Sequence, residues 1–514
     1  MIPIFPWLFS YAEIHYRFHL LVPLYYRRLP EIISDAPLRI TCKRGQLPVL
    51  LIVKDAHLFP VSIDGIRVEI SAGNERRMHS FSIGEQIAVP YWARSFECPV
   101  QEFKPDSELN LTVLIEYTAR NRKYMSINDN YPGIKPEPYR CFYASAGLPY
   151  PPGWFAGEPH YHSNFTSDQV EFGADIANTV KLARALDLKW LFITDHSYDL
   201  DDSPITYLQQ DTSLPKWHLM KKETAQHDNA SFRVIPAEEV SMGNLKGRNI
   251  HVLAVNHDHF LPGSGDSAEK WFRNRPDHSV SEIKELHRAD NLFMAAHPFE
   301  EIPLLQRITL RRGNWHSGDL LESGIRHLQI INSADLFQLE KNILQWSRLL
   351  LQGYKFLIIA GNDAHGNFNL MRQVRIPFVK LYSSRNQCFG QMHTVFSHSE
   401  NEPVRALKKG KIIVSNGPFL NFWLETAGTI VEIGQMTTAK NAFLHYDQRS
   451  TEEFGKQRRI ELILGEQMIG RERVLTDLRN GMEINLPHEG YCRMKMVTEK
   501  GGIVLTNPIW IHRK

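Results

Sequence analysis

Histidines and carboxylates stand directly after several short apolar runs of this sequence, where predicted strands end. His160 and His162 flank one tyrosine in the segment GEPHYHSNFTSDQ. Acids or histidines also follow the runs WLFIT, FRVIPA, NLFMAA and KFLIIAG, namely Asp195, His196, Glu238, Glu239, His297, Asp363 and His365. Imidazole and carboxylate ligands together suit zinc, manganese or iron(II). The pattern predicts a metal site, and a carboxylate shared by two ions would place them about 3.5–4 Å apart for the activation of water.

The spacing within these segments favours shared ligation. Side chains at positions i and i+2 of a strand point to the same face. His160 and His162 can therefore bind one ion, whereas Tyr161 should point to the opposite face of the strand. Asp363 and His365 have the same spacing. One such pair could be chance in a chain with 23 histidines, but several strand ends of this kind indicate a gathered site.

The elements that must gather these residues alternate between strand-like and helix-like segments from about 154 to 400. Each apolar run there is short and apolar throughout, as expected for parallel strands covered on both faces. Helical patterns such as ADIANTVKLARALDL and VSEIKELHRAD lie between the runs. The count of about seven β/α units predicts an α/β barrel, whose strands converge at their C-terminal ends on the face where active sites are built.

The regions on either side of this segment are predicted to be β-rich. Residues 36–150 contain β-like runs such as PVLLIVKD and ELNLTVLIEYT at the spacing of a sandwich. After residue 400, EPVRALKKGK predicts one helix, and the later runs predict a small sandwich. We therefore expect a β-rich domain over 1–150, a barrel over 151–400, and a helix plus a β-sandwich-like domain over 401–514.

Composition narrows the class of protein. The chain has 514 residues, of which 43% are hydrophobic and 23% charged, as in a soluble globular protein. The net charge of +2 and the lack of a long basic run argue against a dedicated nucleic-acid binder. Five cysteines lie far apart without zinc or redox spacing. Their odd number fits a reducing compartment, so we expect a cytoplasmic protein.

The aromatic first 28 residues match neither a signal peptide nor a membrane span. They lack a basic start, a clean apolar stretch and a small-residue cleavage site. Glu13, His15, Arg17 and His19 interrupt the apolar residues, so no transmembrane segment is expected. The segment either packs on the body of the protein or lies against a membrane or a partner.

Five segments resemble, in order, the motifs of the PHP (polymerase and histidinol phosphatase) family of metal-dependent phosphoesterases. They are HYH, ITDH, PAEEVS followed by IHVLAVN, AAHP and GNDAHG, within about 154–400. The tail segments ALKKGKIIVSNGPFL and LTNPIWI resemble the carbaryl-hydrolase-like (CehA/McbA) branch, which extends the resemblance to roughly 154–514. The resemblance implies an α/β fold, a distorted (βα)7 TIM-like PHP barrel with a two- or three-metal centre, followed by a β-domain.

The resemblance also implies ligands for two or three divalent ions, which would be zinc, manganese or iron. The first ion would take His160, His162, Glu239 and Asp363. The second would share Glu239 and add His251 and His297. The third would use Asp168, His196 and His365. Asp195 would accept an N–H from a ligand histidine and so fix the orientation of its ring.

Three of these assignments depend on local features. Glu239 is preferred over Glu238 because the family's glutamate directly precedes a Val/Ile-Ser/Thr pair, here Val240-Ser241. His251 begins an apolar run, so it reaches the site only if the chain between it and Glu239 folds as a hairpin. Asp168 is either a ligand or the N-cap of the helix that follows it.

Other polar residues are candidates for contact with a substrate. Tyr198 and Arg248 follow strand ends and could touch it. His257 and His259 form a second His-x-His pair, which lines either the mouth of the site or a solvated loop.

The expected activity is that of a metal-dependent hydrolase, in which cations lower the pKa of a water that attacks phosphorus or a carbonyl carbon. His196 or His365 could donate a proton to the leaving group. No G-x-S-x-G nucleophile signature competes. A small-molecule phosphoester is the expected substrate, and a carbamate, carboxylic ester or amide is the alternative. A non-catalytic, metal-containing binding or scaffold protein is a third hypothesis, and the oligomeric state is left open.

Overall fold

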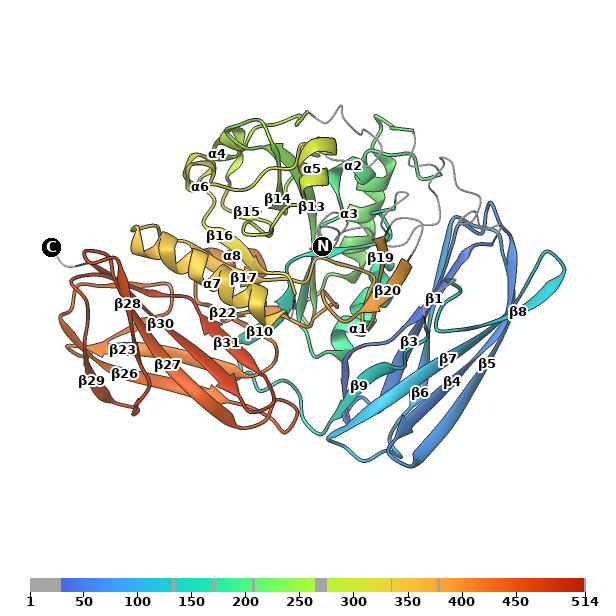
Figure 1. Ribbon diagram of the computed structural model, residues 1–514, viewed down its shortest axis with the longest axis horizontal. Coiled ribbons are helices and arrows are strands. Elements are labelled where there is room, and N and C mark those ends of the chain that lie inside the picture. The colour runs from blue at the N-terminus through green and yellow to red at the C-terminus, as the bar shows by residue number, and fades with distance from the viewer. Residues whose placement is uncertain are drawn as a thin grey trace, which may run out of the picture.

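The computed structural model describes residues 29–131, 135–167, 172–205, 209–263, 275–333, 335–376 and 380–512. Figure 1 shows the early strands as one lobe, the late strands as a second lobe on the opposite side, and most helices between them. The aromatic N-terminal segment, whose packing on the body was one prediction, lies outside the described residues.

The first lobe consists of two sheets that share one apolar core. One sheet has the order β1-β3-β6, and the other has the order β2-β9-β7-β4-β5 with β8 paired to β7. In β7 every second side chain from Leu109 to Tyr117 is buried, because alternate residues face the core between the sheets. The strands are β1 (Glu31–Asp35), β2 (Arg39–Thr41), β3 (Gln46–Lys54), β4 (Val61–Ala72), β5 (Glu75–Ile87), β6 (Tyr91–Pro99), β7 (Ser107–Ala119), β8 (Arg122–Ile127) and β9 (Tyr139–Ala144).

The middle of the chain contributes the strands that carry the candidate site. They are β10 (Trp154–Glu158), β11 (Tyr161–His162), β12 (Trp190–Ile193), β13 (Arg233–Gly243), β14 (Asn249–Val255), β15 (Leu292–Ala295), β16 (His327–Ile331), β17 (Leu357–Ala360), β18 (Ala364–His365), β19 (Met371–Ile376), β20 (Lys380–Ser384) and β21 (His393–Ser397). Strands β10, β12 and β13 are parallel neighbours, and so are β15, β16 and β17. The two groups are joined through β14, which is antiparallel to both β13 and β15.

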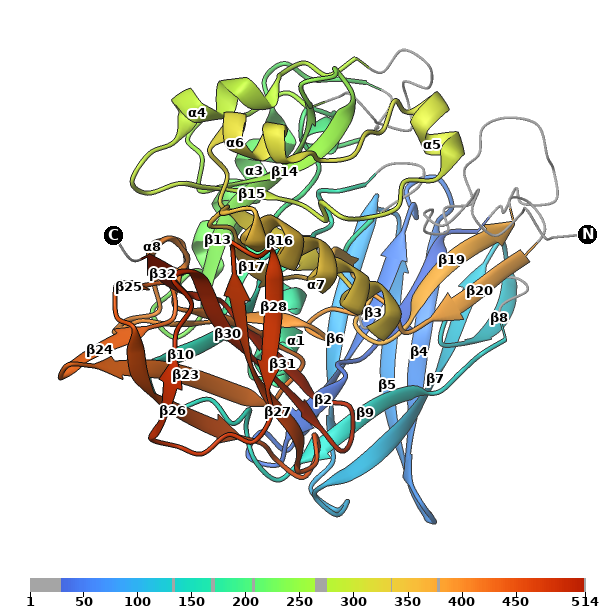
Figure 2. The same cartoon turned by 60° about the vertical axis from the view of Figure 1, so that its left-hand side comes forward.

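The helices of the described residues are mostly short. They are α1 (Ile176–Ala185), α2 (Ser197–Leu200), α3 (Pro215–His227), η4 (Val280–Glu282), α4 (Ile283–Leu286), α5 (Leu304–Thr309), α6 (Ser317–Ser323), α7 (Leu336–Leu351) and α8 (Pro403–Lys409). Asp335 caps α7 by accepting the backbone N–H groups of the first turn, and Leu339, Ile343, Trp346 and Leu350 form its buried stripe. Helix α7 packs against β16 and the late strands β27 and β30, and Figure 2 shows its ribbon beside these strands.

The late strands form a second pair of sheets. They are β22 (Ile412–Ser415), β23 (Phe419–Thr426), β24 (Thr429–Glu432), β25 (Met436–Thr437), β26 (Asn441–Arg449), β27 (Gln457–Glu466), β28 (Arg471–Leu475), β29 (Met482–Asn485), β30 (Glu489–Thr498), β31 (Ile503–Thr506) and β32 (Ile509–His512). A four-stranded sheet of order β24-β23-β26-β29 shares its core with β27 and β30. Strands β27, β28, β30 and β31 belong to the same sheet as the middle strands, through β22 and β21.

The prediction of an α/β fold with a (βα)7 TIM-like barrel is wrong. Strands make up 46% of the described residues and helices 15%. Strands β10, β12 to β17 and β21 belong to one mixed sheet of 15 strands, whereas β11 with β18 and β19 with β20 form separate two-stranded sheets. The sheet runs on into the late strands, and β13 and β14 form an antiparallel hairpin with no helix between them. Short runs that are apolar throughout look the same in parallel and antiparallel strands, so the pattern could not distinguish the two. The boundaries proposed at residues 150 and 400 stay predictions.

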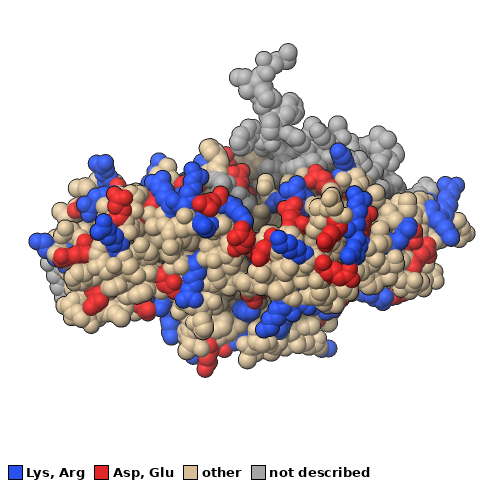
Figure 3. All heavy atoms as spheres, turned by 90° about the horizontal axis from the view of Figure 1, so that it is seen from below, with Lys and Arg blue, Asp and Glu red and all other residues tan. Residues whose placement is uncertain are grey.

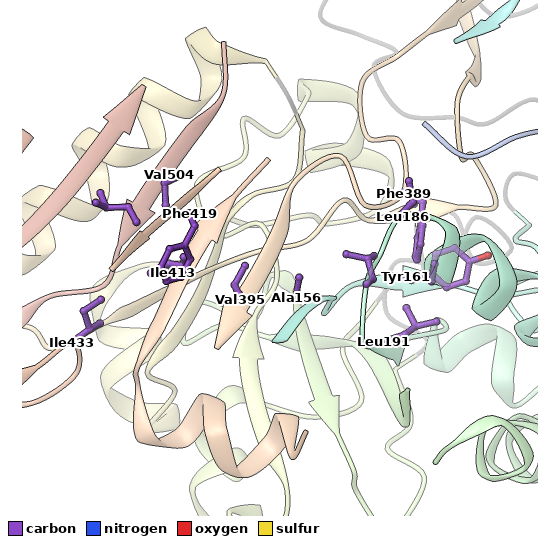
Figure 4. Packing of buried hydrophobic residues seen from close by; sticks show 14 of the residues in the cluster. Ala156, Tyr161, Leu186, Leu191, Phe389, Val395, Ile413, Phe419, Ile433 and Val504 are labelled. Carbon is purple, nitrogen blue, oxygen red and sulfur yellow. The ribbon is translucent and has the colours of Figure 1, made fainter. Parts of the chain in front are cut away.

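Strand alternation separates the apolar core from the polar side of β11. Tyr161 points into the core, where it gathers with Leu186, Leu191 and Phe389, as Figure 4 shows. Its hydroxyl lies 2.7 Å from Thr179 Oγ1. His162, the next residue, is therefore directed to the opposite side, in agreement with the predicted alternation.

Surface charge and helix hydropathy add two observations. Lysine and arginine are interspersed with aspartate and glutamate on the face shown in Figure 3. Among the described residues, no helix is both long enough and apolar enough to cross a membrane.

Candidate metal centre

Two histidines of the site become neighbours because the short strands β11 and β18 pair in parallel. The register places His162 opposite His365. Their rings stack with centroids 4.1 Å apart and an angle of 3° between their planes. The chain just before each strand is also joined, since the Asp363 N–H donates to the His160 carbonyl over 3.1 Å. Segments about 200 residues apart in the sequence thus meet at one point.

Strands β12 and β13 contribute the next two residues in the same way. Their parallel pairing ends at Ile193 and Pro236, and the chains stay side by side for a few residues more. The Glu239 N–H donates to the Asp195 carbonyl over 3.0 Å, and His196 lies across from Glu239 in an isolated bridge. His196 and Glu239 therefore reach the site from adjacent strand ends.

The β13–β14 hairpin adds His251. Ser241 pairs with His251, so the imidazole lies on the same sheet surface as Glu239, two residues along β13. His251 Nδ1 is 2.6 Å from Glu239 Oε1. The chain between Glu239 and His251 does fold as a hairpin, and this fold brings His251 to the site as expected.

His297 and Asp363 follow the ends of β15 and β17 in unusual backbone conformations. Their φ angles are 28° and 52°, which non-glycine residues seldom adopt. His297 Nε2 lies 3.1 Å from Glu239 Oε1. Asp363 Oδ1 lies 3.1 Å from His162 Nε2 and 3.2 Å from His160 Nε2. Such conformations persist where the surrounding structure holds them, and they concentrate at functional sites.

The Glu239 carboxylate occupies the centre of this arrangement. Its Oε2 lies 3.2 Å from Nε2 of both His160 and His162 and 3.3 Å from His196 Nδ1. Its Oε1 faces His251 and His297 instead. One carboxylate thus touches five imidazoles, with each oxygen turned to a different set.

Three groups of side chains bring ligand atoms within 4.8 Å of one another among the described residues. They are His160, His162, Glu239 and Asp363; Glu239, His251 and His297; and His162, His196 and His365. The side chains of all three groups are buried or nearly buried; the first two groups combine nitrogen and oxygen atoms, and the third offers imidazole nitrogens alone. This donor set fits zinc, manganese or iron(II), so the residues present are compatible with the predicted ions.

The charges of the cluster favour added cations. Burial alone would raise the pKa of Glu239, but the imidazoles of His251 and His160 outweigh it and hold the pKa well below its usual range. Burial alone would lower the pKa of His160, yet Asp363 and Glu239 raise it to about 9. His160 would therefore carry a proton at a position where an ion could bind. Burial and repulsion from His365 and His196 lower the pKa of His162, which keeps that ring neutral, the form that binds metals.

Two polar residues that the sequence analysis missed orient ligand rings. Gln329 in β16 donates from its amide nitrogen to the Gly361 carbonyl over 3.0 Å, so its oxygen faces His160 Nδ1 at 2.7 Å. His160 then carries its proton on Nδ1 and directs Nε2 into the site. Glu300 lies 3.2 Å from His297 Nδ1 in the same role. A glutamine between the apolar residues Leu328 and Ile330 of the run IRHLQIIN was a signal for the first of these.

Asp195 supports the site by a different route from the one predicted. Its carboxylate accepts the N–H of Ser163, the N–H of Thr166 and the Ser163 hydroxyl, at 2.7–3.1 Å. None of these bonds comes from a ligand histidine. Thr166 Oγ1 in turn lies 3.3 Å from His162 Nδ1 and accepts the His196 N–H. Asp195 therefore fixes the loop that orients His162. It does not contact a ligand imidazole in these bonds.

The remaining candidates fall outside the ligand groups. Asp168 lies outside the described residues, so its choice between ligand and helix cap stays a prediction. Glu238 faces away from the histidines and accepts from the Ser197 hydroxyl and the Leu261 N–H. Tyr198 stacks on His196 with ring centroids 4.6 Å apart. Arg248 is exposed and donates to a backbone carbonyl, that of Arg307.

The His257-x-His259 pair lies in a partly exposed loop. His257 Nδ1 is 2.6 Å from the His259 carbonyl, so the pair bonds within itself. This contact favours the solvated loop over the mouth of the site.

Comparisons with known proteins identify no relative. No protein-family model matches the chain, and no curated protein matches it. Two solved structures of the β-glucuronidase of Parabacteroides merdae, one with glycerol in its active site, align over 94% of this chain at 9% identity. Their TM-scores are 0.20 and 0.19, and the chain spans 64% of that enzyme's length. Likeness at this level supports no inference about fold or activity.

Proposed function

We propose that the protein is a hydrolase that uses two or three divalent metal ions. The observation that carries the proposal is the Glu239 carboxylate, whose two oxygens face different groups of buried imidazoles. A carboxylate placed in this way can be shared by two ions, the arrangement found in two-metal hydrolases. Bound ions would supply activated water and neutralise charge that develops on the substrate.

The residues around the ligand groups would provide positioning and a proton. During hydrolysis of a phosphoester, the water oxygen bonds to phosphorus, the bond from phosphorus to the leaving oxygen breaks, and that oxygen gains a proton. His196 and His365 border the ligand group of His162 and could supply this proton if only two ions are held. If a third ion is held, both would be ligands.

Phosphoesters are the proposed substrates because the five motifs resemble those of the PHP phosphoesterases. The tail resembles the carbaryl-hydrolase-like branch, so carbamates, carboxylic esters and amides form the second class. We also propose a cytoplasmic location, since the chain has an odd number of cysteines and all five are free thiols.

The test combines elemental analysis of the purified protein with a substrate panel of p-nitrophenyl phosphate, bis-p-nitrophenyl phosphate, p-nitrophenyl acetate and an aryl carbamate. We expect two or three ions per chain and turnover of a phosphoester. Glu239→Gln should lose at least one ion and reduce kcat/KM by about 100-fold or more, because the shared carboxylate is lost.

Glu238→Gln is the matched control for this experiment. It changes the adjacent acid on the other face of β13, and a glutamine oxygen can still accept from Ser197 and Leu261. Metal content and turnover should stay near those of the unchanged protein. Fewer than one ion per chain together with no turnover would support a binding or scaffold protein instead.

A further inference from the structure

The segment that follows His365 is bonded to the first lobe. His365 ends β18, and its N–H donates to Asn367 Oδ1 over 2.6 Å. The next N–H along the chain, that of Phe368, donates to Asp35 Oδ2 over 3.0 Å. Asp35 is the last residue of β1. A strand of the first lobe therefore holds the chain three residues after a candidate ligand.

Asn369 makes a second connection to the first lobe. Its Oδ1 accepts the Arg140 N–H over 3.0 Å, and its Nδ2 donates to the Arg140 carbonyl over 2.7 Å. Nδ2 also lies 3.3 Å from the Ala36 carbonyl. The side chain is fully buried, so water has no access to replace these bonds if they are lost.

Arg372 completes the connection with a buried charge. Its Nε donates to Asp129 Oδ2 over 2.7 Å. Its Nη2 donates to the Ser34 carbonyl over 3.2 Å and to Tyr139 Oη over 2.9 Å. Leu370, two residues earlier, is buried in the apolar core of the first lobe. A buried charge pair is costly to separate, so this stretch of the chain is firmly part of the first lobe.

This connection adjoins the third ligand group, which consists of His162, His196 and His365. Strand β18 has only two residues, and it pairs with β11. Before the strand, the Asp363 N–H holds the chain to the His160 carbonyl, and after it the first lobe holds the chain. So short a pair of strands contributes few hydrogen bonds of its own, which leaves the position of the His365 ring to these flanking contacts.

We propose that the first lobe positions His365 for the third ligand group, with Asp35 and Asn369 as positioning residues that contact neither an ion nor a substrate. The inference rests on the proposed metal-dependent function, and it assigns the first lobe a role at the candidate metal centre.

The test replaces Asn369 with alanine and measures metal affinity by competition with a chromophoric chelator. Asn369→Ala should weaken metal binding about 10-fold or more, the effect of losing a group that supports a ligand. Elemental analysis should show a reduced ion content. In the metal-free protein, amide hydrogen exchange of residues 364–370 should become faster, because the loop opens more often.

Asn130→Ala is the matched control. Asn130 is also a buried asparagine, whose Oδ1 accepts the Ile32 N–H over 3.1 Å and whose Nδ2 donates to the Pro30 carbonyl over 2.8 Å. Both bonds stay within the first lobe. Both substitutions should lower the midpoint of chemical denaturation, but Asn130→Ala should change metal affinity by less than about twofold.

A pair of variants at Asp35 tests the second positioning residue and does not depend on the folding of Asn369→Ala. Asp35→Asn keeps an oxygen that can accept the Phe368 N–H, whereas Asp35→Ala removes it. Asp35→Asn should therefore retain more of the metal affinity than Asp35→Ala.

The outcomes separate the inference from the function on which it rests. Metal affinity in Asn369→Ala equal to that of the unchanged protein would overturn the inference and leave the hydrolase proposal standing. Equal losses of affinity in Asn369→Ala and Asn130→Ala would overturn it as well, because they would reflect general destabilisation. An unchanged protein that binds no ion would remove the proposed function, and the inference with it.

Discussion

At the scale of residues, the adjacent glutamates Glu238 and Glu239 lie in different surroundings on the two faces of β13. Glu239 faces the imidazoles, whereas Glu238 lies on the other face of β13, where burial raises its pKa to about 8. Neighbouring side chains of a strand point to opposite faces, so only one of the two can join the ligand groups. The motif pattern selected Glu239 from the sequence, and strand geometry explains the choice.

Gln329 should set the metal affinity of His160 through the orientation of its ring. Gln329→Leu removes the acceptor at His160 Nδ1, which frees the ring to rotate or change tautomer. We expect the metal affinity to fall about 10- to 100-fold. Competition with a chromophoric chelator measures this change directly and does not depend on finding a substrate.

Gln329→Glu tests the same contact by conservative replacement. A glutamate keeps an oxygen beside His160 Nδ1, although it gives up the bond that the amide donates to the Gly361 carbonyl. It should bind metal more tightly than the leucine variant. Identical metal affinity in both variants and in the unchanged protein would show that Gln329 does not orient the ring.

At the scale of elements, the strand ends were predictable and the pairing of strands was not. The runs WLFIT, FRVIPA, NLFMAA and KFLIIAG all form strands, and residues after them meet at the site. The helix predicted over 280–290 is shorter, with η4 and α4 ending at Leu286. The antiparallel direction of β14 depends on the tight turn at Asn244–Gly247, not on the apolar pattern that the barrel prediction used.

The position of β18 should depend on Gly366, the glycine that follows this strand. Gly366 has a φ of 69°, and an added Cβ would lie 2.7 Å from the Ala174 backbone nitrogen. Gly366→Ala should lower the free energy of unfolding by roughly 2 kcal/mol or more, because it adds a backbone clash to the strain of a left-handed conformation. Because His365 precedes this glycine, metal content should fall as well. Chemical denaturation and elemental analysis measure the two effects.

The control substitution Gly73→Ala separates the destabilisation caused by backbone strain from that caused by the steric clash. Gly73 has a similar φ of 57° in the turn between β4 and β5, and nothing lies within 4 Å of an added Cβ. We expect a loss of about 1 kcal/mol from conformational strain alone and unchanged metal content. Equal destabilisation by the two substitutions would contradict the steric account of Gly366.

At the scale of the whole molecule, one sheet joins the candidate site to the late strands. The sheet continues from β10 through β21, β22 and β31 to β30, so the regions predicted as separate share backbone hydrogen bonds. Their cores are also shared, since Tyr161 belongs to the same apolar cluster as residues of β23 and β30. The large shared core encloses some histidines, and a histidine buried in this way favours the neutral form of its ring.

The stability of the molecule should decrease in mild acid because of buried His327. Burial lowers its pKa from 6.5 to about 4, while its Nε2–H donates to the Leu407 carbonyl over 2.9 Å. Between these values the unfolded chain binds the proton and the folded protein does not, so stability falls as the pH drops from 6.5 to 4. The loss from this residue should reach about 3 kcal/mol at pH 4.

His327→Gln should flatten this part of the pH profile. Glutamine does not titrate, and its amide can still donate to Leu407. Free energies of unfolding measured by denaturant at pH 7, 5.5 and 4 give the slope for each protein. His218→Gln, on the exposed side of α3, should keep the slope of the unchanged protein. A slope unaffected by His327→Gln would refute the assignment.

The sequence by itself determined the residue types of the site and their places at the ends of strands. Those features are local, because an apolar run predicts a strand and the residues after it lie where the strand stops. It also determined that His160 and His162 share a face, since alternation along a strand depends only on the chain itself.

Only the tertiary structure decided which strands run parallel, how far the sheet extends, and which distant residues meet the ligands. The pairing of β11 with β18 joins segments about 200 residues apart, and the contact of Gln329 with His160 joins residues 169 apart. Backbone hydrogen bonds between strands are the same for every residue type, so a sequence pattern does not specify its partner strand. The packing of whole sheet faces selects the partner of each strand. It thereby determines which side chains surround the candidate metal centre.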